Sequence, residues 1–483
     1  MKRSAFLKRL SAWSGAAAVA PSAWLAACGG DAGAGTGPSD DGSGPDGSPL
    51  QLPPTLRPDG LSLTAREGTV SLGPGQTSRA WMYDDLLPGP TLRGRTGDGV
   101  RMTLVNGLQE QTVVHWHGVD APEHADGHPR LAVGPGATLA YDFTLENRAG
   151  TYWYHPHPHE RTAIQTYRGM AGFFLVDDAD SDALDLPTGS REVPLVLQDK
   201  RLDGSGEIVY APSGPDIMTG FLGDVPFVNG TPFPYLPVDR TLYRFRLLNG
   251  SNARIFDLAL TTGLSFVLIG NDGGFLERPE TLQSILLGPG ERVDVLVDFT
   301  GAPAGDTVVL QSRAFSLAGP PSSQGVAMDL MRFVISSAPA APRALPEALP
   351  ALPASPPTEG VPQQTFSFTS GMGRHRINGS AFQMDRVDAR IPLGEPQVWR
   401  FLNSSPVPHP VHLHSAHFRV RSRNGGRGRL YPWEGGLKDT VLLMPFESVE
   451  VVVHFVRHRG LYLMHCHNLE HEDDGMMLNF EVT

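Results

Sequence analysis

One short segment near the carboxyl end carries three histidines, a cysteine and a methionine in the order HCHNLEHEDDGM, from His465 to Met476. Side chains of a strand point alternately to its two faces, so Cys466 would lie on one face and His465 and His467 on the other. A thiolate, imidazole rings and a weakly bound thioether are the ligands of a blue-copper electron-transfer centre. We therefore expect Cys466, His471 and Met476 to bind one copper ion, while the two flanking histidines face a second metal site.

Three further histidine clusters lie upstream and would supply the partners of that second site. They read HWH from position 115, HPH from 155 and HPVHLH from 409. A single HxH pair is commonly an ordinary hydrogen-bonded pair, but four clusters that hold ten of the 17 histidines indicate a shared metal centre. The upstream candidates are His115, His117, His155, His157, His409, His412 and His414.

The four motifs resemble, in content and in order, the copper-binding motifs of the multicopper oxidases, the laccase-like group. The resemblance covers roughly residues 60 to 483 and extends to the connecting segments VPFVNG, LGPGERVDVLVDF, RINGSAF and KDTV. It implies an enzyme with four copper ions, namely one type 1 ion, one type 2 ion and a type 3 pair. The last three would form a trinuclear cluster.

The resemblance also implies which residues bind each copper ion. The type 1 ligands would be His409, Cys466, His471 and Met476. The type 2 ligands would be His115 and His412. One type 3 ion would take His117, His155 and His467, and the other would take His157, His414 and His465. Most of the other seven histidines are not expected to be ligands.

Two acidic residues are candidates for proton delivery. Asp126 lies eleven residues after His115, and Glu472 directly follows His471. The resemblance places both where related enzymes have proton donors, and reduction of dioxygen to water consumes protons. The alternative is that HADG and HEDDG are acidic turns with solvated carboxylates. We expect Asp126 and Glu472 to be the catalytic acids.

The chain contains an internal repeat. GPGATLAYDF and MPFESVEVVVHF are each followed by a histidine segment that begins 21 residues after their first residue. Asn106 and Asn403 each precede a cluster histidine by nine residues. A third copy, at 244–260 and 288–299, has apolar residues near Leu258, Leu260 and Leu310 where the other copies have histidines. The repeat predicts three similar domains, of which the middle one binds no copper.

Short runs rich in Val, Leu, Phe and Thr alternate with Gly, Pro, Asn and Asp turns, which predicts an all-β protein. The length and the family resemblance specify three consecutive cupredoxin-like Greek-key β-sandwich domains. We expect domain 1, which binds copper, at 55–180 and a copper-free spacer domain at 188–337. A Pro/Ala-rich linker at 338–362 would lead to domain 3 at 363–483, which holds the type 1 copper and half of the trinuclear cluster.

The amino-terminal segment has the features of an export signal. Four basic residues among the first nine precede an apolar stretch that ends in LAAC, which resembles a bacterial lipobox. We expect residues 1–27 to be a lipoprotein-type signal and Cys28 to be lipidated, the alternative being an ordinary secretory signal. Residues 28–54 would be a disordered tether. The protein would then lie in the bacterial cell envelope, on the periplasmic or extracellular face, after export by the general secretory or twin-arginine route.

Cysteine content and charge exclude several alternatives. The chain has two cysteines, Cys28 and Cys466, and each already has a task, so no disulfide is expected. The formal net charge is -12 and the basic residues are scattered, which argues against nucleic acid as a partner. We expect a monomer that contacts a membrane only through the lipid anchor at Cys28.

The leading hypothesis is a laccase-like oxidase. It would couple four one-electron oxidations of phenols, aromatic amines or metal ions at the type 1 copper to the four-electron reduction of dioxygen to water. The alternative is a cuprous-ion oxidase for copper tolerance, but many such enzymes carry a Met-rich insertion before the last domain. Here no methionine lies between Met331 and Met372. A copper nitrite reductase or a copper-free envelope scaffold is less favoured, because the type 3 histidines are complete.

Overall fold

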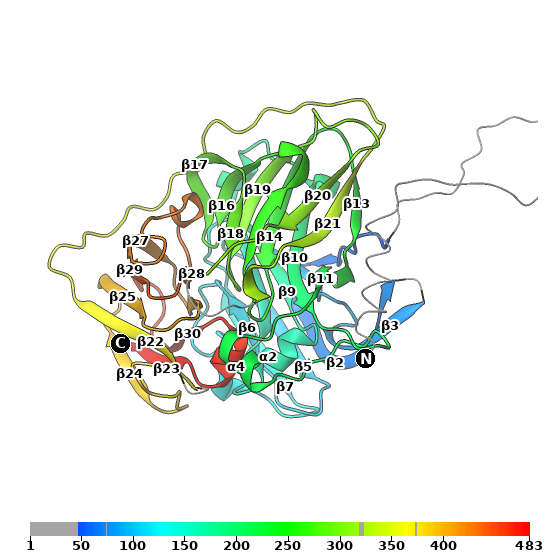
Figure 1. The fold of residues 1–483 in the computed structure, drawn as a ribbon. Coiled ribbons are helices and arrows are strands. Elements are labelled where there is room, and N and C mark those ends of the chain that lie inside the picture. Colours follow the sequence, from blue (N-terminus) through cyan, green and yellow to red (C-terminus); the bar gives the residue numbers. More distant parts are fainter. Residues whose placement is uncertain (1–46, 74, 318–322, 372–373) are drawn as a thin grey trace, which may run out of the picture.

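The computed structural model describes residues 47–73, 75–317, 323–371 and 374–483. Strands dominate these ranges, and six sheets pair into three β-sandwiches that follow one another along the chain. Figure 1 shows the first sandwich in blue and cyan, the second in green and the third in yellow to red. This confirms the predicted fold of three cupredoxin-like domains.

The first sandwich packs a four-stranded sheet against a five-stranded sheet. The four-stranded sheet contains β3 (Gln76–Tyr83), β2 (Asp59–Gly73), β5 (Gly99–Asn106) and β7 (Thr138–Thr144). The other contains β1 (Thr55–Leu56), β4 (Thr91–Arg95), β9 (Gly172–Asp177), β8 (Gly150–Pro156) and β6 (Val114–His117). In β5, Val100, Met102 and Leu104 are buried at every second position, which is the period of a strand with one face in the core.

The second sandwich is the largest. Its seven-stranded sheet contains β12 (Thr231–Pro232), β11 (Val225–Val228), β10 (Glu192–Lys200), β14 (Leu242–Asn249), β19 (Arg292–Asp298), β16 (Phe266–Asn271) and β17 (Gly274–Leu282). Its five-stranded sheet contains β13 (Tyr235–Val238), β21 (Met328–Ile335), β20 (Thr307–Ser312), β15 (Phe256–Leu260) and β18 (Ile285–Leu287). The segment from β21 to the third sandwich, which includes the predicted linker, has no helix or strand of its own.

The third sandwich packs two five-stranded sheets. One contains β23 (Arg374–Ile377), β22 (Gln363–Gly371), β25 (Gln397–Asn403), β29 (Ser448–Val453) and β27 (Phe418–Asn424). The other contains β24 (Val387–Ile391), β31 (Met477–Val482), β30 (Gly460–Cys466), β26 (His409–Leu413) and β28 (Thr440–Leu443). Each sandwich has a hydrophobic core of its own, which includes Trp116, Phe245 and Trp399 respectively.

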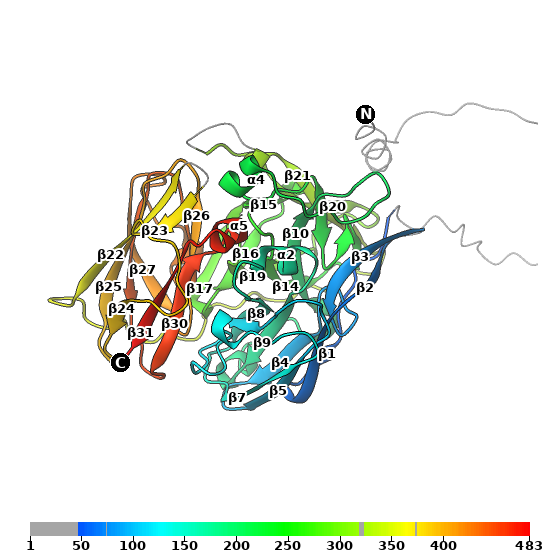
Figure 2. The same cartoon turned by 90° about the horizontal axis from the view of Figure 1, so that it is seen from below.

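Helices are short in the described residues. The α-helices are α2 (Thr162–Tyr167), α3 (Ala179–Asp182), α4 (Gly214–Thr219) and α5 (Leu469–Asp473). The 3-10 helices are η1 (Pro129–Leu131), η2 (Gly189–Arg191), η3 (Thr261–Gly263), η4 (Ser323–Gly325) and η5 (Pro432–Glu434). In these ranges we find no helix with both the length and the apolar character that a membrane crossing requires. Figure 2 shows α2, α4 and α5 gathered between the sandwiches, and α5 packs against both of the others.

Three asparagines mark the internal repeat in the structure. Asn106, Asn249 and Asn403 are the last residues of β5, β14 and β25. Each side-chain amide donates hydrogen bonds of 2.8 to 3.0 Å to two backbone carbonyls. Each side-chain oxygen accepts from the backbone N–H two residues further on. The same asparagine hydrogen-bond pattern therefore occurs once in each sandwich, as the sequence repeat predicts.

Strand register shows where the copies diverge. His115 of β6 lies opposite His155 of β8, and His412 of β26 lies opposite His465 of β30. In the second sandwich Leu258 lies opposite Ser312, and Leu260 lies opposite Leu310. The position equivalent to His155 is thus Ser312, not the expected Leu310. The second sandwich still has no imidazole at these positions.

The amino-terminal region departs from expectation in one respect. The predicted signal, Cys28 and most of the predicted tether lie outside the described residues. The end of that tether is bound to the second sandwich, because Leu50 N–H donates to Tyr235 O at 2.8 Å and Tyr235 N–H donates to Ser48 O at 3.0 Å. The Leu50 side chain packs against the core of the second sandwich. An apolar residue at this position explains why the segment is not a free tether up to residue 54.

Candidate metal centres

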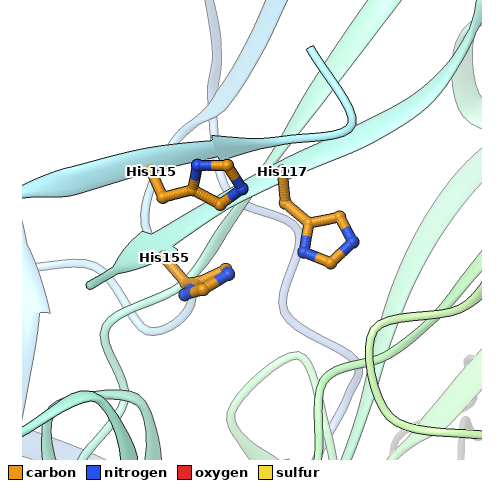
Figure 3. A group of neighbouring side chains, drawn as sticks. All are labelled: His115, His117 and His155. Carbon is orange, nitrogen blue, oxygen red and sulfur yellow. The ribbon is translucent and has the colours of Figure 1, made fainter. Parts of the chain in front are cut away.

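The first sandwich gathers imidazole rings at one edge. Figure 3 shows His115 and His117 on β6 and His155 on β8, with their rings directed toward a shared space. His115 and His117 share a face because they are two residues apart in a strand. All three side chains are completely buried. Two adjacent strands therefore bring three potential ligands together.

The third sandwich presents a matching set of rings to the first. His115 Nε2 lies 3.2 Å from His412 Nε2, although 297 residues separate them in the sequence. His157 Nε2 lies 3.3 Å from His465 Nε2. The eight histidines assigned to the trinuclear cluster therefore meet between the first and the third sandwich.

Proton positions show that the His115 and His412 pair fits a metal ion. His115 Nδ1 lies 2.7 Å from the carbonyl oxygen of Asp126, and His412 Nδ1 lies 3.0 Å from that of Asp439. A carbonyl oxygen only accepts, so each Nδ1 carries the proton and each Nε2 presents a lone pair. Two lone pairs that face each other at 3.2 Å repel unless a cation lies between them. This donor pair fits the expected type 2 copper.

The other six histidines form two triangles. The ring-centre distances are 5.0 Å for His117 to His467, 5.3 Å for His155 to His467 and 5.7 Å for His117 to His155. They are 4.9 Å for His157 to His465, 5.2 Å for His157 to His414 and 5.3 Å for His414 to His465. These are the two groups of three that the family resemblance assigns to the type 3 pair.

Several nitrogens of these rings lack a hydrogen-bond partner. They are His117 Nδ1, His155 Nε2, His157 Nδ1 and both nitrogens of His467. Burying an unpaired polar atom costs free energy, and a metal ion bound by His117, His155 and His467 would satisfy one nitrogen of each of these rings. Burial also lowers the pKa of His157 to about 3 and that of His465 to about 4, so both rings are neutral at pH 7 and able to bind a metal ion.

A separate group of three donors fits the type 1 copper. Cys466 Sγ lies 3.4 Å from His409 Nδ1 and 3.6 Å from His471 Nδ1. The two Nδ1 atoms are 3.2 Å apart, and all three residues are buried. His471 Nε2 lies 3.3 Å from the carbonyl oxygen of Met218 on α4, which places the ring proton there and leaves Nδ1 free. A thiolate with two imidazoles in a triangle is the blue-copper arrangement.

The fourth expected type 1 ligand reaches the same place through a turn of the chain. α5 follows β30 and reverses the backbone, so that Cys466 N–H donates to Met476 O at 3.0 Å and Met476 N–H donates to His471 O at 2.9 Å. Met476 is completely buried in the core that contains Cys466. The segment therefore folds back as the spacing predicts, and a thioether is available beside the three donors.

His375 belongs to the surroundings of this site and was not singled out by its sequence context. Its ring stacks on His471 with centres 3.8 Å apart and an angle of 17° between the planes. Ser370 Oγ lies 2.6 Å from His375 Nδ1 and 3.2 Å from His409 Nε2. No His-rich spacing surrounds residue 375, so only the packing of β22 and β23 brings it here.

The two expected acids lie against the cluster. Asp126 Oδ2 lies 2.7 Å from His414 Nδ1. Glu472 Oε2 lies 3.1 Å from His465 Nδ1, and its Oε1 lies 3.6 Å from His157 Nε2. Burial raises the pKa of both carboxyl groups. Neither residue is a solvated turn carboxylate, because both are completely or almost completely buried.

Asp439 is a further neighbour that the sequence did not identify as a site residue. It lies within KDTV, which served only to extend the family resemblance. Asp439 Oδ1 lies 3.0 Å from His117 Nε2 and 2.6 Å from Nη1 of Arg292. Burial opposes ionisation of Asp439, but the charge of Arg292 outweighs it and holds the pKa well below its usual value.

Known proteins carry the same sequence features and the same fold. Sequence profiles described as multicopper oxidase match residues 64–181, 223–328 and 352–483. A bilirubin oxidase of Albifimbria verrucaria is 34% identical over 83% of this chain and 72% of its own length. A laccase of Bacillus stratosphericus is 31% identical over 84% of this chain and 91% of its own length.

Solved structures agree with the sequence comparison. The crystal structure of the McoA multicopper oxidase of Aquifex aeolicus superimposes with a TM-score of 0.84 at 37% identity. The match covers 90% of this chain and 99% of that one. Donor groups close enough to hold a metal ion include His157 with His414 and His465, and Cys466 with His409 and His471, and these donor types suit copper. The chain belongs to the multicopper oxidase family and is an oxidoreductase.

Proposed function

We propose that the chain is a laccase-like oxidase that couples one-electron oxidations of phenols or aromatic amines to the reduction of dioxygen to water. The observation that carries this proposal is the position of Cys466. Its sulfur belongs to the group with His409 and His471, while its sequence neighbours His465 and His467 belong to the two triangles of histidines. One strand end therefore joins a one-electron site to an oxygen-reducing site.

The residues of this segment have complementary tasks. When bound, four copper ions supply the one-electron and four-electron redox chemistry. Cys466 and the backbone on either side of it provide a short covalent path from the type 1 site to His465 and His467. Complete burial of these side chains keeps water away from the path.

Protons for the reaction would come through the two buried acids. We infer that Asp126 holds a proton next to His414 and that Glu472 holds one between His157 and His465. A general acid must lie within hydrogen-bond reach of the group it serves, directly or through one water. Both carboxyl groups meet this condition on the cluster side, and they approach the rings from different segments of the chain.

The choice of reductant depends on what reaches the type 1 site. α4 of the second sandwich covers His471, since the Met218 carbonyl accepts from the His471 ring. A second candidate function, cuprous-ion oxidation, is favoured by the same residue, because the half-buried thioether of Met218 is a soft ligand that suits Cu(I). The absence of methionine between Met331 and Met372 ranks this function below phenol oxidation.

Oxygen uptake measured side by side decides between these reductants. We expect the copper-loaded protein to consume oxygen with a phenol such as 2,6-dimethoxyphenol, and Met218→Leu to leave that rate unchanged. Preference for cuprous ion, lost in Met218→Leu, would establish the metal oxidase instead. Copper analysis separates the other classes: about four ions per chain for an oxidase, about two for a nitrite reductase and none for a scaffold.

We also propose that the protein is exported and anchored by a lipid at Cys28, as the LAAC segment indicates. Wild-type protein should incorporate a labelled fatty acid, and Cys28→Ala should lose this label with no loss of oxidase activity. Wild-type protein without the label would reject the anchor. A monomer is expected by light scattering.

A further inference from the structure

The second sandwich touches the histidine cluster, although it contributes no histidine to it. Gly290, in the turn before β19, lies directly against the rings. A Cβ at this position would be 3.0 Å from Cδ2 of His467 and 3.2 Å from Cε1 of His117. Its φ of +82° also favours glycine. The second sandwich thus contacts two rings of the cluster through this turn.

Arg292, two residues later, binds all three sandwiches at once. Its Nε donates to Thr151 O of the first sandwich at 3.0 Å. Its Nη1 donates to Asp439 Oδ1 of the third at 2.6 Å and to Gly290 O of its own at 2.9 Å. Its Nη2 donates to Asp272 O at 3.1 Å. The side chain is completely buried, so each of these bonds replaces water and fixes the guanidinium.

The Asp439 carboxylate connects Arg292 to His117, a histidine of the cluster. Asp439 Oδ1 lies 3.0 Å from His117 Nε2. An ionised carboxylate only accepts, so the His117 proton lies on Nε2 and the lone pair on Nδ1. That Nδ1 is buried and has no hydrogen-bond partner. His117 therefore presents Nδ1 to the cluster, whereas His115 and His412 present Nε2.

Neighbouring groups pack closely around Arg292 and Asp439. Gly118, with a φ of +82°, lies against both partners, and a Cβ there would be 2.6 Å from Arg292 Nη2. Lys438, beside Asp439, forms ion pairs with Asp272 of the second sandwich at 2.9 Å and with Glu291 at 3.2 Å. Asp272 Oδ1 also accepts from the backbone N–H of Arg292 at 2.8 Å, so the Asp272 carboxylate contacts both Arg292 and Lys438.

We propose that Arg292 is a positioning residue of the trinuclear copper cluster, which sets the tautomer and orientation of His117 through Asp439. The second sandwich then contacts the cluster through Gly290 and positions His117 through Arg292, so it is not only a spacer. This inference rests on the proposed function, because it assumes that the eight histidines bind three copper ions.

The test compares Arg292→Lys and Arg292→Gln with Arg246→Lys. Arg246 is a matched control: it is equally buried in the second sandwich and donates to Thr151 Oγ1 at 3.0 Å, but its carboxylate partner is Glu192. Copper-loaded proteins are titrated with a chelator while three spectral signals are followed. These are the type 2 electron paramagnetic resonance signal, the type 3 near-ultraviolet band and the blue type 1 band.

We expect both Arg292 variants to lose the type 2 and type 3 signals at about 10- to 100-fold lower chelator concentration, as for other partners of metal ligands. The blue band should be lost at the wild-type concentration, and Arg246→Lys should match wild type in all three signals. Parallel loss of all three signals in the Arg292 variants would mean a general structural role and would overturn the inference. So would wild-type retention of the type 2 and type 3 signals.

A second measurement covers the case in which the Arg292 variants do not fold. In metal-free protein labelled with ¹⁵N-histidine, His117 should give the nitrogen shifts of an Nε2–H ring, and Asp439→Asn should change them. Unchanged shifts would overturn the inference. Failure of the proposed function is a different result: wild-type protein that folds but shows no type 2 or type 3 signal after copper loading.

Discussion

At the scale of single residues, proton position decides which imidazoles can bind a metal ion. Backbone carbonyls accept hydrogen bonds from Nδ1–H of His115 and His412, so the Nε2 atoms that face each other carry no proton. A backbone carbonyl on α4 accepts a hydrogen bond from Nε2–H of His471, which leaves Nδ1 available for the expected type 1 copper. The nitrogen that each ring offers to a metal ion is thus determined by a neighbouring carbonyl group.

One prediction at this scale concerns Asp126. Asp126→Asn removes an acid 2.7 Å from His414 and should lower the rate of oxygen consumption by about 10²- to 10⁴-fold, the range of general acid catalysis. The blue band should be unchanged, because the type 1 residues lie elsewhere. Asp120→Asn is the control, since Asp120 is buried nearby but pairs with Arg457. Equal rates in both variants would remove Asp126 from the mechanism.

At the scale of elements, a strand pair with a closing asparagine is the repeated unit. The strand register places His115 opposite His155 and His412 opposite His465. The asparagine that ends the preceding strand of the chain donates to the loop that leads into each pair. In the second sandwich the same unit carries Leu258 and Ser312. The second sandwich therefore has the same strand pair and closing asparagine, although it has no histidine at these positions.

A prediction at this scale is that the asparagine stabilises each unit independently of copper. Asn249→Ala leaves two buried carbonyls, those of Arg254 and Leu287, without their donor. The loss should be about 2 to 4 kcal/mol in the free energy of unfolding. The denaturation midpoint of metal-free Asn249→Ala, compared with that of metal-free wild type, measures this loss. Asn249→Asp keeps the acceptor for Ser251 N–H but should lose at least as much as Asn249→Ala, because a carboxylate oxygen would face two buried carbonyl oxygens.

At the scale of the whole molecule, buried ion pairs connect the sandwiches. Glu192 of β10 pairs with Arg93 of the first sandwich at 2.8 Å and with Arg246 of its own at 2.7 Å. Burial alone would raise the pKa of Glu192, but the charges of Arg246, Arg244 and Arg93 outweigh it and lower the pKa to about 2. This interface should therefore depend on pH.

The sign of that dependence follows from the lowered pKa. Ionised Glu192 stabilises the folded state fully above its unfolded pKa of 4.5, and the contribution is lost as pH falls toward about 2. The difference in unfolding free energy between wild type and Glu192→Gln should shrink by about 3 kcal/mol over this window. Thermal denaturation of the metal-free proteins at several pH values measures it. A difference that is constant from pH 7 to pH 2 would contradict the assignment.

The histidine pairs that share a strand face could be predicted from sequence because they are local: HxH in a strand and the HCH segment place two rings on one face without reference to the rest of the chain. The fold could be predicted because the repeat is visible in residue spacing. Asp439, Arg292 and His375 could not, since each reaches its site through contacts between distant segments. The binding of Ser48 and Leu50 to the second sandwich also depends on such a contact.

The measurement that tests the central claim most directly is copper analysis of Cys466→Ser, in parallel with wild type. If Cys466 joins two separate centres, the variant should lose the blue band and about one copper ion per chain, while the type 2 and type 3 signals persist. Its oxygen consumption should cease, because the electron path begins at the missing thiolate. Loss of all copper, or a blue band that survives, would contradict the account.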